Sequence, residues 1–194
     1  MFRAVKRAGT TLILVLILSA CTSAKDREFS DLIEQARVHV SNFEYQAAAD
    51  VYSKALEVKE DATVRSELIK INADIKEVRE VKEMTSDLQA YAGTYKNVIS
   101  SSDLIEMCDE LTKVVNSIDS FDASRNSPAA KYIQDMRKSN RYFDFTSSIE
   151  MARIYRLVEG QEGHDTFTDA KAISDSLDAL LASVPVPSEF GAIN

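Results

Sequence analysis

The sequence predicts an all-α protein. Along most of the chain, apolar residues recur at intervals of three and four, which is the period of an α-helix. No segment alternates polar and apolar residues over a useful length, and no Asn-Gly or Asp-Gly hairpin turn occurs. Only five glycines and three prolines interrupt the 194 residues. We therefore expect consecutive antiparallel helices joined by short links.

Residues 1–20 are predicted to be an export signal. The first seven residues include three basic side chains, and the apolar stretch of residues 12–18 is too short to span a bilayer. The stretch Leu18-Ser19-Ala20-Cys21 follows and resembles the lipobox of bacterial lipoproteins. This resemblance implies cleavage before Cys21, acylation of its thiol, and attachment to the membrane through the acyl chains. The alternative is ordinary secretory cleavage beside a chance cysteine.

Removal of residues 1–20 leaves 174 residues and changes the net charge from −8 to −11, because three basic side chains and no acidic ones are lost. This length suits one domain or one helical array. We exclude nucleic acid as a partner because an acidic surface repels phosphates. With Cys21 acylated, Cys108 has no partner for an intramolecular disulfide, and its apolar neighbours predict a buried thiol.

The first folded element is predicted to be a helical hairpin. Residues 21–28 are polar and lack apolar periodicity, so we expect a tether there, followed by a single domain over residues 29–187 and a tail over residues 188–194. Ser30 is a suitable N-cap for a first helix, which stops at Ser41-Asn42. A second helix runs from Phe43 to Val58. The short link makes the two helices antiparallel.

The second helix carries small residues where two helices approach closely. Ala48 and Ala55 are one such pair, and Tyr52 lies between them. Over residues 30–60 this pattern resembles a tetratricopeptide repeat (TPR). The resemblance implies a peptide-binding groove lined by the first helix, at positions that correspond to Ile33, Arg37, Val40 and Ser41. The competing interpretation places Ile33 and Val40 in the core and leaves Arg37 solvated.

A single repeat cannot form a superhelix, since about three are needed for a stable stack. The later helices are therefore either degenerate repeats or a separate bundle. Residues 61–92 predict a long helix with a narrow apolar seam and a charged back, and Gly93-Thr94 marks its break. The next helix covers residues 101–121, with Ser102 or Asp103 as its N-cap.

Helices also fill the last third of the chain. Ser127-Pro128 starts one well, and it breaks near Ser139-Asn140 or within residues 146–148. Residues 160–164 read as an interhelical turn. Asp165 or Thr166 caps a final helix, which the prolines at 185 and 187 end. Its predicted buried face consists of Phe167, Ala170, Ile173, Leu177, Leu180 and Leu181. Phe190 is the one tail residue expected to pack.

The search for reactive groups yields no catalytic constellation. The two histidines, His39 and His164, lack a second ligand at a helical metal-binding spacing, and no Gly-x-Ser-x-Gly motif occurs. We expect His39 inside the hairpin and His164 on an exposed turn. We predict no enzymatic activity, cofactor or metal site.

Two hypotheses about function follow. The first is a lipid-anchored, extracytoplasmic interaction or assembly module of the cell envelope, with a protein or peptide partner. Thr22 does not resemble an inner-membrane retention signal, so a two-membrane envelope would place the protein in the outer membrane. Otherwise it would lie on the outer face of the plasma membrane. The alternative is a carrier of a small apolar ligand, lined by aromatic residues. Tyr142, Phe143 and Phe145 are most simply core, or else an exposed docking patch.

Overall fold

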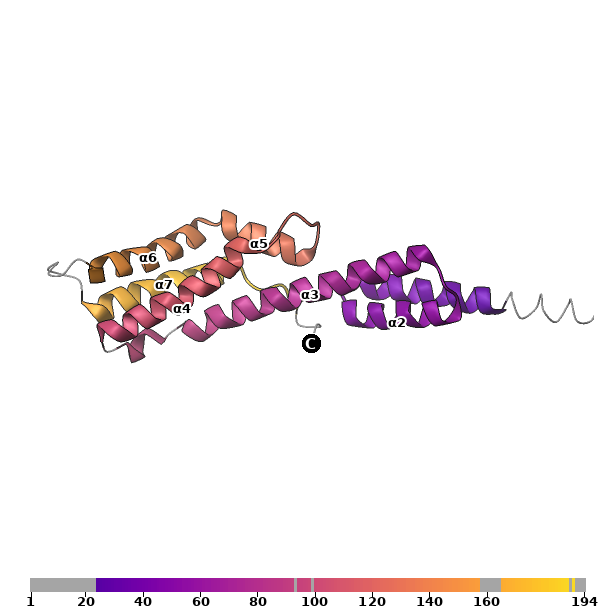
Figure 1. Cartoon of the computed structure of the whole chain (residues 1–194), viewed down its shortest axis with the longest axis horizontal. Helices are drawn as coiled ribbons and strands as arrows, with labels where there is room; N and C mark the ends of the chain where they lie inside the picture. The colour runs from indigo at the N-terminus through magenta and orange to yellow at the C-terminus, as the bar shows by residue number, and fades with distance from the viewer. Residues whose placement is uncertain (1–23, 93, 99, 158–164, 189, 191–194) are drawn as a thin grey trace, which may run out of the picture. The chain divides into compact units, whose positions relative to one another are not determined.

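The computed structural model describes residues 24–92, 94–98, 100–157, 165–188 and 190. These residues form helices joined by turns and contain no β-strand, which confirms the all-α prediction (Figure 1). No helix within them is both long enough and apolar enough to cross a membrane. Cys21, the predicted break at Gly93, and the predicted turn that contains His164 lie outside the described residues.

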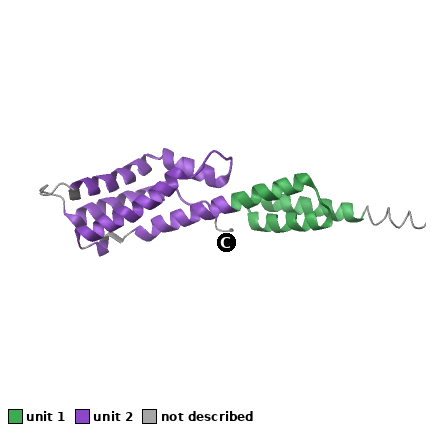
Figure 2. Ribbon diagram, in the orientation of Figure 1, with its two compact units in different colours: residues 1–75, 193 green, residues 76–192, 194 purple. Residues whose placement is uncertain are grey.

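The chain divides into two compact units, residues 1–75 with 193 and residues 76–192 with 194 (Figure 2). The sequence analysis expected one domain over residues 29–187, with a subdivision at residue 61. In the structure the division lies inside the long helix α3 (Ala62–Tyr91). Each unit therefore uses a different part of the same continuous helix.

Unit 1 contains the predicted hairpin, whose first helix covers residues 24–41. The start near Ser30 is therefore wrong, and the described end of the predicted tether is helical. A residue distant in sequence contacts the first turns of this helix. Lys59 Nζ lies 2.9 Å from Asp26 Oδ1 and 5.4 Å from the centre of the Phe29 ring. Ser30 does not act as a cap, because its hydroxyl donates to the carbonyl of Asp26 at 2.9 Å.

The hairpin turn is a left-handed cap on the first helix. Phe43 has a φ of 61°, a position that usually favours glycine. The Glu44 N–H donates to the His39 carbonyl at 2.9 Å, and the Phe43 N–H donates to the Val40 carbonyl at 3.0 Å. These bonds satisfy carbonyls that the helix end would leave open. His39 lies at this turn rather than inside the hairpin, with its Nδ1 2.5 Å from Glu44 Oε2.

The second helix of the hairpin is α2 (Tyr45–Val58), and the first part of α3 completes the unit. The predicted small positions Ala48 and Ala55 are buried, as is Tyr52 between them. Asp61 caps α3, since its carboxylate accepts from the N–H groups of Thr63 and Val64 at 2.9 and 3.0 Å.

Unit 2 contains the rest of α3, the short helix η1 (Thr94–Asn97), α4 (Ser101–Ser120), α5 (Pro128–Lys138), α6 (Asn140–Leu157) and α7 (Thr166–Ser183). Helix α6 packs along α7, and α4 contacts both (Figure 1). The largest side chains fully buried between these elements are Leu88, Leu104, Leu111, Ile118, Ile133, Met136, Phe145, Ile173, Leu177, Leu180 and Phe190.

Capping side chains set most of the helix starts in unit 2. Ser127 caps α5 ahead of the proline, as predicted, and Asp165, one of the two predicted candidates, caps α7. The predicted cap of α4 is wrong, because Ser100 accepts from the Asp103 N–H while the Asp103 carboxylate accepts from the Ser100 N–H. This reciprocal pair is a capping box, so Asp103 is its third helical residue rather than the cap. Helix α5 ends at Lys138 with Ser139 as its C-cap, at the first of the two predicted break points.

One aromatic residue of the C-terminal tail, Phe190, packs against unit 2, as expected. Phe190 is buried and packs edge-on against Tyr132, with ring centres 5.8 Å apart. The Tyr132 hydroxyl donates to the Val184 carbonyl at 3.1 Å. Phe167, by contrast, was predicted buried and is 52% exposed. It lies six residues before Ile173, which places it about 120° around α7 from that core residue.

Candidate interaction surfaces

The four residues that the TPR resemblance singles out lie on one side of the first helix. Ile33 and Val40 are half-buried at the edge of the core, while Arg37 and Ser41 are exposed. The Ser41 hydroxyl donates to the Val38 carbonyl at 2.8 Å, so it is engaged within its own helix. The predicted surface is therefore a narrow polar strip with apolar edges.

Arg37 also has a role inside unit 1. Its guanidinium hydrogen-bonds the hydroxyl of Tyr52, which is buried on α2, and Glu67 of α3 lies close enough to influence the same group. Burial raises the pKa of Tyr52, and the Glu67 carboxylate raises it further, while Arg37 opposes both. Arg37 thus links the first helix of the hairpin to α2, and a change at this position would disturb packing as well as any bound partner.

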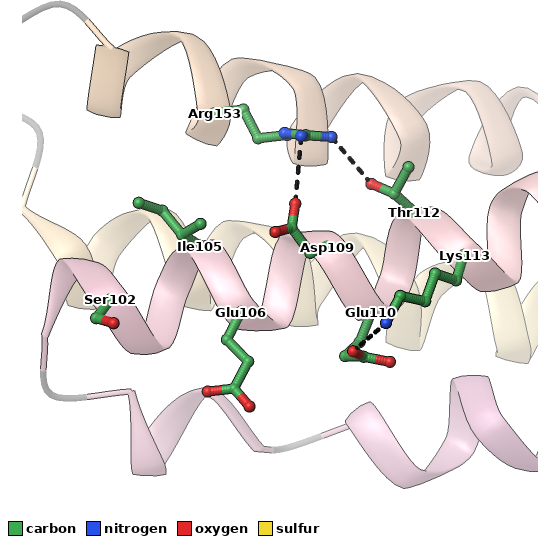
Figure 3. A pocket seen from close by; sticks show the side chains of 8 residues that line it. All are labelled: Ser102, Ile105, Glu106, Asp109, Glu110, Thr112, Lys113 and Arg153. Carbon is green, nitrogen blue, oxygen red and sulfur yellow. Dashed lines mark hydrogen bonds and ion pairs between the residues drawn. The ribbon is translucent and has the colours of Figure 1, made fainter.

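A groove of about 490 Å³ runs along α4 in unit 2 (Figure 3). Its lining residues are Ser102, Ile105, Glu106, Asp109, Glu110, Thr112, Lys113 and Arg153. Arg153 projects from α6 toward α4, with Nη2 3.2 Å from Asp109 Oδ1 and Nη1 3.4 Å from Thr112 Oγ1 (Figure 3). This contact makes the α6 wall of the groove.

The groove carries more acid than base. Of its two cations, Arg153 is held by Asp109, and Lys113 Nζ lies 2.5 Å from Glu110 Oε1. The hydrogen bond from this ammonium to Glu110 raises the pKa of Lys113. Among the described residues, Glu106 makes no ion pair, and its side chain projects from α4 away from Arg153 (Figure 3). The groove therefore keeps an uncompensated negative charge.

A second hollow of about 240 Å³ shares Glu106 and Glu110 with the groove and extends to Tyr91 and Asn97. Burial raises the pKa of Tyr91, and the neighbouring Glu110 carboxylate adds to the effect. Glu106 and Glu110 of α4 therefore lie between the groove and the second hollow and line both of them.

Helix α6 has two apolar faces. Tyr142, Phe145 and Ile149 face the core, and the Tyr142 hydroxyl donates to Asp119 Oδ1 at 2.8 Å. The opposite side carries three large apolar side chains that are 71%, 43% and 47% exposed: Phe143, Met151 and Ile154. We call these three residues, with Ser147 and Glu150 between them, the outer row of α6.

The structure thus splits the aromatic group that the sequence analysis treated as core. The prediction is confirmed for Tyr142 and Phe145 and wrong for Phe143. Phe143 and Phe145 are two residues apart, which separates them by about 200° around a helix. Eleven residues separate Phe143 from Ile154, about three full turns, so these two share a face. This spacing of Phe143 and Ile154 in the sequence could have indicated that they share a helix face separate from that of Phe145.

Reactive groups do not converge on these surfaces. Within the described residues, no group of three or more His, Cys, Asp and Glu side chains could hold a metal ion. Cys108 is buried, as predicted, and burial raises its pKa to about 11. Its thiol therefore stays protonated at neutral pH and is a poor nucleophile.

Comparison of the chain with protein-family models, with curated proteins and with solved structures finds no match.

Proposed function

We propose that this protein is a lipid-anchored, extracytoplasmic helical module that binds a protein partner at the cell envelope. The observation that carries the proposal is the outer row of α6. Large apolar side chains at 43–71% exposure, aligned on one helix face, are typical of a surface that another protein covers. The attachment at Cys21 rests on the lipobox resemblance.

The alternative, a carrier for a small apolar ligand, fits the same residues less well. A carrier needs an apolar cavity, and its lining was expected from Tyr142, Phe143 and Phe145. Tyr142 and Phe145 are instead packed into the core, while Phe143 points away from it. The groove and the second hollow beside α4 are both lined by carboxylates. These features favour a protein partner over an apolar small molecule.

The hairpin of unit 1 remains a second candidate surface, on the strength of the TPR resemblance. Ser41 is the better probe of this surface, because Arg37 is engaged with Tyr52. The outer row is the stronger of the two candidates, because its side chains have no evident role in packing unit 2.

Photocrosslinking in intact cells tests the proposal. A photoreactive amino acid placed at Phe143 should give one specific protein product, identified by mass spectrometry. Ile69 is the matched control, since it is an exposed apolar residue of α3 at 65% exposure and lies outside both candidate surfaces. A product from Ser41 but not Phe143 would move the partner to the hairpin. Products from neither position, or the same product from Ile69, would refute the proposal.

The anchor is tested separately. Cells fed a palmitate analogue should label the wild-type protein, and the Cys21→Ser variant should be unlabelled and released from the membrane fraction. Equal labelling of both proteins would refute acylation at Cys21. This result would leave the crosslinking test unaffected.

A further inference from the structure

We propose that the partner segment bound by unit 2 is a cationic amphipathic helix, which lays its apolar stripe along the outer row of α6 and its basic residues over the acidic side of α4. This inference rests on the proposed function and specifies the chemistry of the partner.

The apolar part of the surface has the dimensions of a short helix. Phe143 and Ile154 are separated by about three turns, or roughly 16 Å at 1.5 Å per residue. A partner helix of three to four turns presents apolar side chains at the same spacing, as in other helix-in-groove complexes. Ile105 adds an exposed apolar contact inside the groove on α4.

The outer row and the groove occupy different sides of α6, about 100° apart around the helix. Arg153 forms the α6 wall of the groove, and the next residue, Ile154, ends the outer row. The ion pair from Arg153 to Asp109 also ties α6 to α4, so the two parts of the surface have a fixed spacing. A partner helix whose apolar stripe lies on the outer row would reach the groove with its long basic side chains, which extend from the edge of that stripe.

Charge identifies the kind of helix that fits. Glu106 in the groove and Glu150 in the outer row are exposed, and neither forms an ion pair within the described part of the chain. The cations at the groove, Lys113 and Arg153, are already paired. Lysine or arginine on the partner would supply the missing charges, and these contacts would weaken as salt increases.

The same charges disfavour the other occupants. A second copy would bring an identical acidic surface, and the chain without its signal has a net charge of −11. An anionic lipid surface would be repelled by the same carboxylates. A basic segment of another protein is the occupant that satisfies both the apolar row and the carboxylates.

The test uses the chain of residues 21–194 with Cys21→Ser, so that no acyl chain is present, after circular dichroism has verified its helical content. The probe is a fluorescent 14-residue helical peptide with leucines at i, i+3, i+4 and i+7 and lysines elsewhere. A matched peptide carries glutamate in place of lysine. We expect the lysine peptide to bind at least about tenfold more tightly, with an affinity that falls between 50 and 300 mM salt.

Variants locate the binding on this surface. Phe143→Ser with Ile154→Ser should weaken binding of the lysine peptide about tenfold or more, while the control Ile69→Ser changes it less than twofold. Glu106→Gln with Glu150→Gln should weaken it about threefold to tenfold. The control for charge is Glu80→Gln, an exposed carboxylate of α3.

Three results would overturn the inference: equal affinity for the two peptides, equal losses in variants and controls, or a dimer that Phe143→Ser dissociates. The crosslinking experiment distinguishes failure of the cationic-helix inference from failure of the proposed function. A specific product from Phe143 whose docking segment is acidic or neutral would preserve the function and overturn the cationic helix. The absence of any specific product would overturn the function itself.

Discussion

Replacement of Arg137 by methionine should destabilise unit 2 by about 2–3 kcal/mol. Arg137 lies in the last turn of α5, yet its guanidinium donates to carbonyls at the end of α4. Nε lies 3.0 Å from the Ile118 oxygen, and Nη2 lies 3.0 Å from the Asp119 oxygen and 2.7 Å from the Phe121 oxygen. The last carbonyls of a helix have no partner of their own, so this side chain acts as a cap from another helix.

The magnitude follows from the number and kind of bonds. A hydrogen bond to a charged group contributes about 1.5–3 kcal/mol. Nη2 also donates to the Ile118 oxygen, so four hydrogen bonds reach three carbonyls. Because Arg137 is half-buried, water replaces part of what is lost, and these bonds together contribute about 2–3 kcal/mol rather than their sum. Methionine keeps the apolar stem, so the change removes the donors with little loss of packing.

The assay is urea unfolding followed by circular dichroism. Lys138→Met is a matched control, because it removes a neighbouring basic charge from the same last turn while its own side chain is exposed. The control should change stability by less than about 0.5 kcal/mol. In a thermal scan, the loss in Arg137→Met corresponds to roughly 5–10 °C for a chain of this length. Equal losses in both variants would show that only the charge matters and would refute the capping argument.

Three further predictions follow from buried groups. Burial raises the pKa of Cys108 from 9.0 to about 11, so the unfolded chain loses this proton at a lower pH than the folded protein does. The free energy of unfolding should therefore be constant below pH 9 and fall by up to about 3 kcal/mol between pH 9 and 11. Urea unfolding of the wild type and of Cys108→Ala at pH 8 and pH 11 measures this loss, which the variant should not show. Phe190→Ala should cost about 3–5 kcal/mol and Phe143→Ala less than 1 kcal/mol in the same titration, because only the first side chain is buried; similar costs would contradict this assignment of the core. The Glu77 carboxylate pairs with the Arg125 guanidinium and accepts the Ser127 hydroxyl at 2.5 Å. Glu77→Ala should therefore lower the free energy of unfolding by about 2 kcal/mol more than Glu80→Ala does, and its melting temperature should be correspondingly lower.

Local chemistry allowed most helix boundaries to be predicted. Ser127 before a proline and Asp165 before an apolar run are capping signals that need no tertiary information, and both act as caps. At α4, three consecutive serines precede Asp103. The spacing of a capping box selects Ser100, because the acid must stand three residues after the cap. The information was therefore in the sequence, although the prediction chose a later residue.

Contacts between distant residues account for what local chemistry could not predict. Residues 24–28 resemble a tether because they carry no apolar stripe. They are nevertheless helical in the structure. Lys59, thirty-three residues after Asp26, pairs with the Asp26 carboxylate and lies over the Phe29 ring. The engagement of Arg37 with Tyr52 is of the same kind. The resemblance could place Arg37 on the groove side of its helix, but only the packing of that helix against α2 reveals its second role.

The candidate site illustrates a more general limit of apolar periodicity. A stripe identifies residues that avoid water, and in a single sequence every such residue is assigned to the one core that the stripe defines. Helix α6 breaks this assumption, because Phe145 and Phe143 lie on opposite sides and only the first contributes to the core. Two apolar faces on one helix lower its apparent amphipathicity, so an exposed row weakens the same signal that would reveal it. The row becomes visible once the core is known, since several large apolar side chains aligned outside a complete core mark a candidate interaction surface.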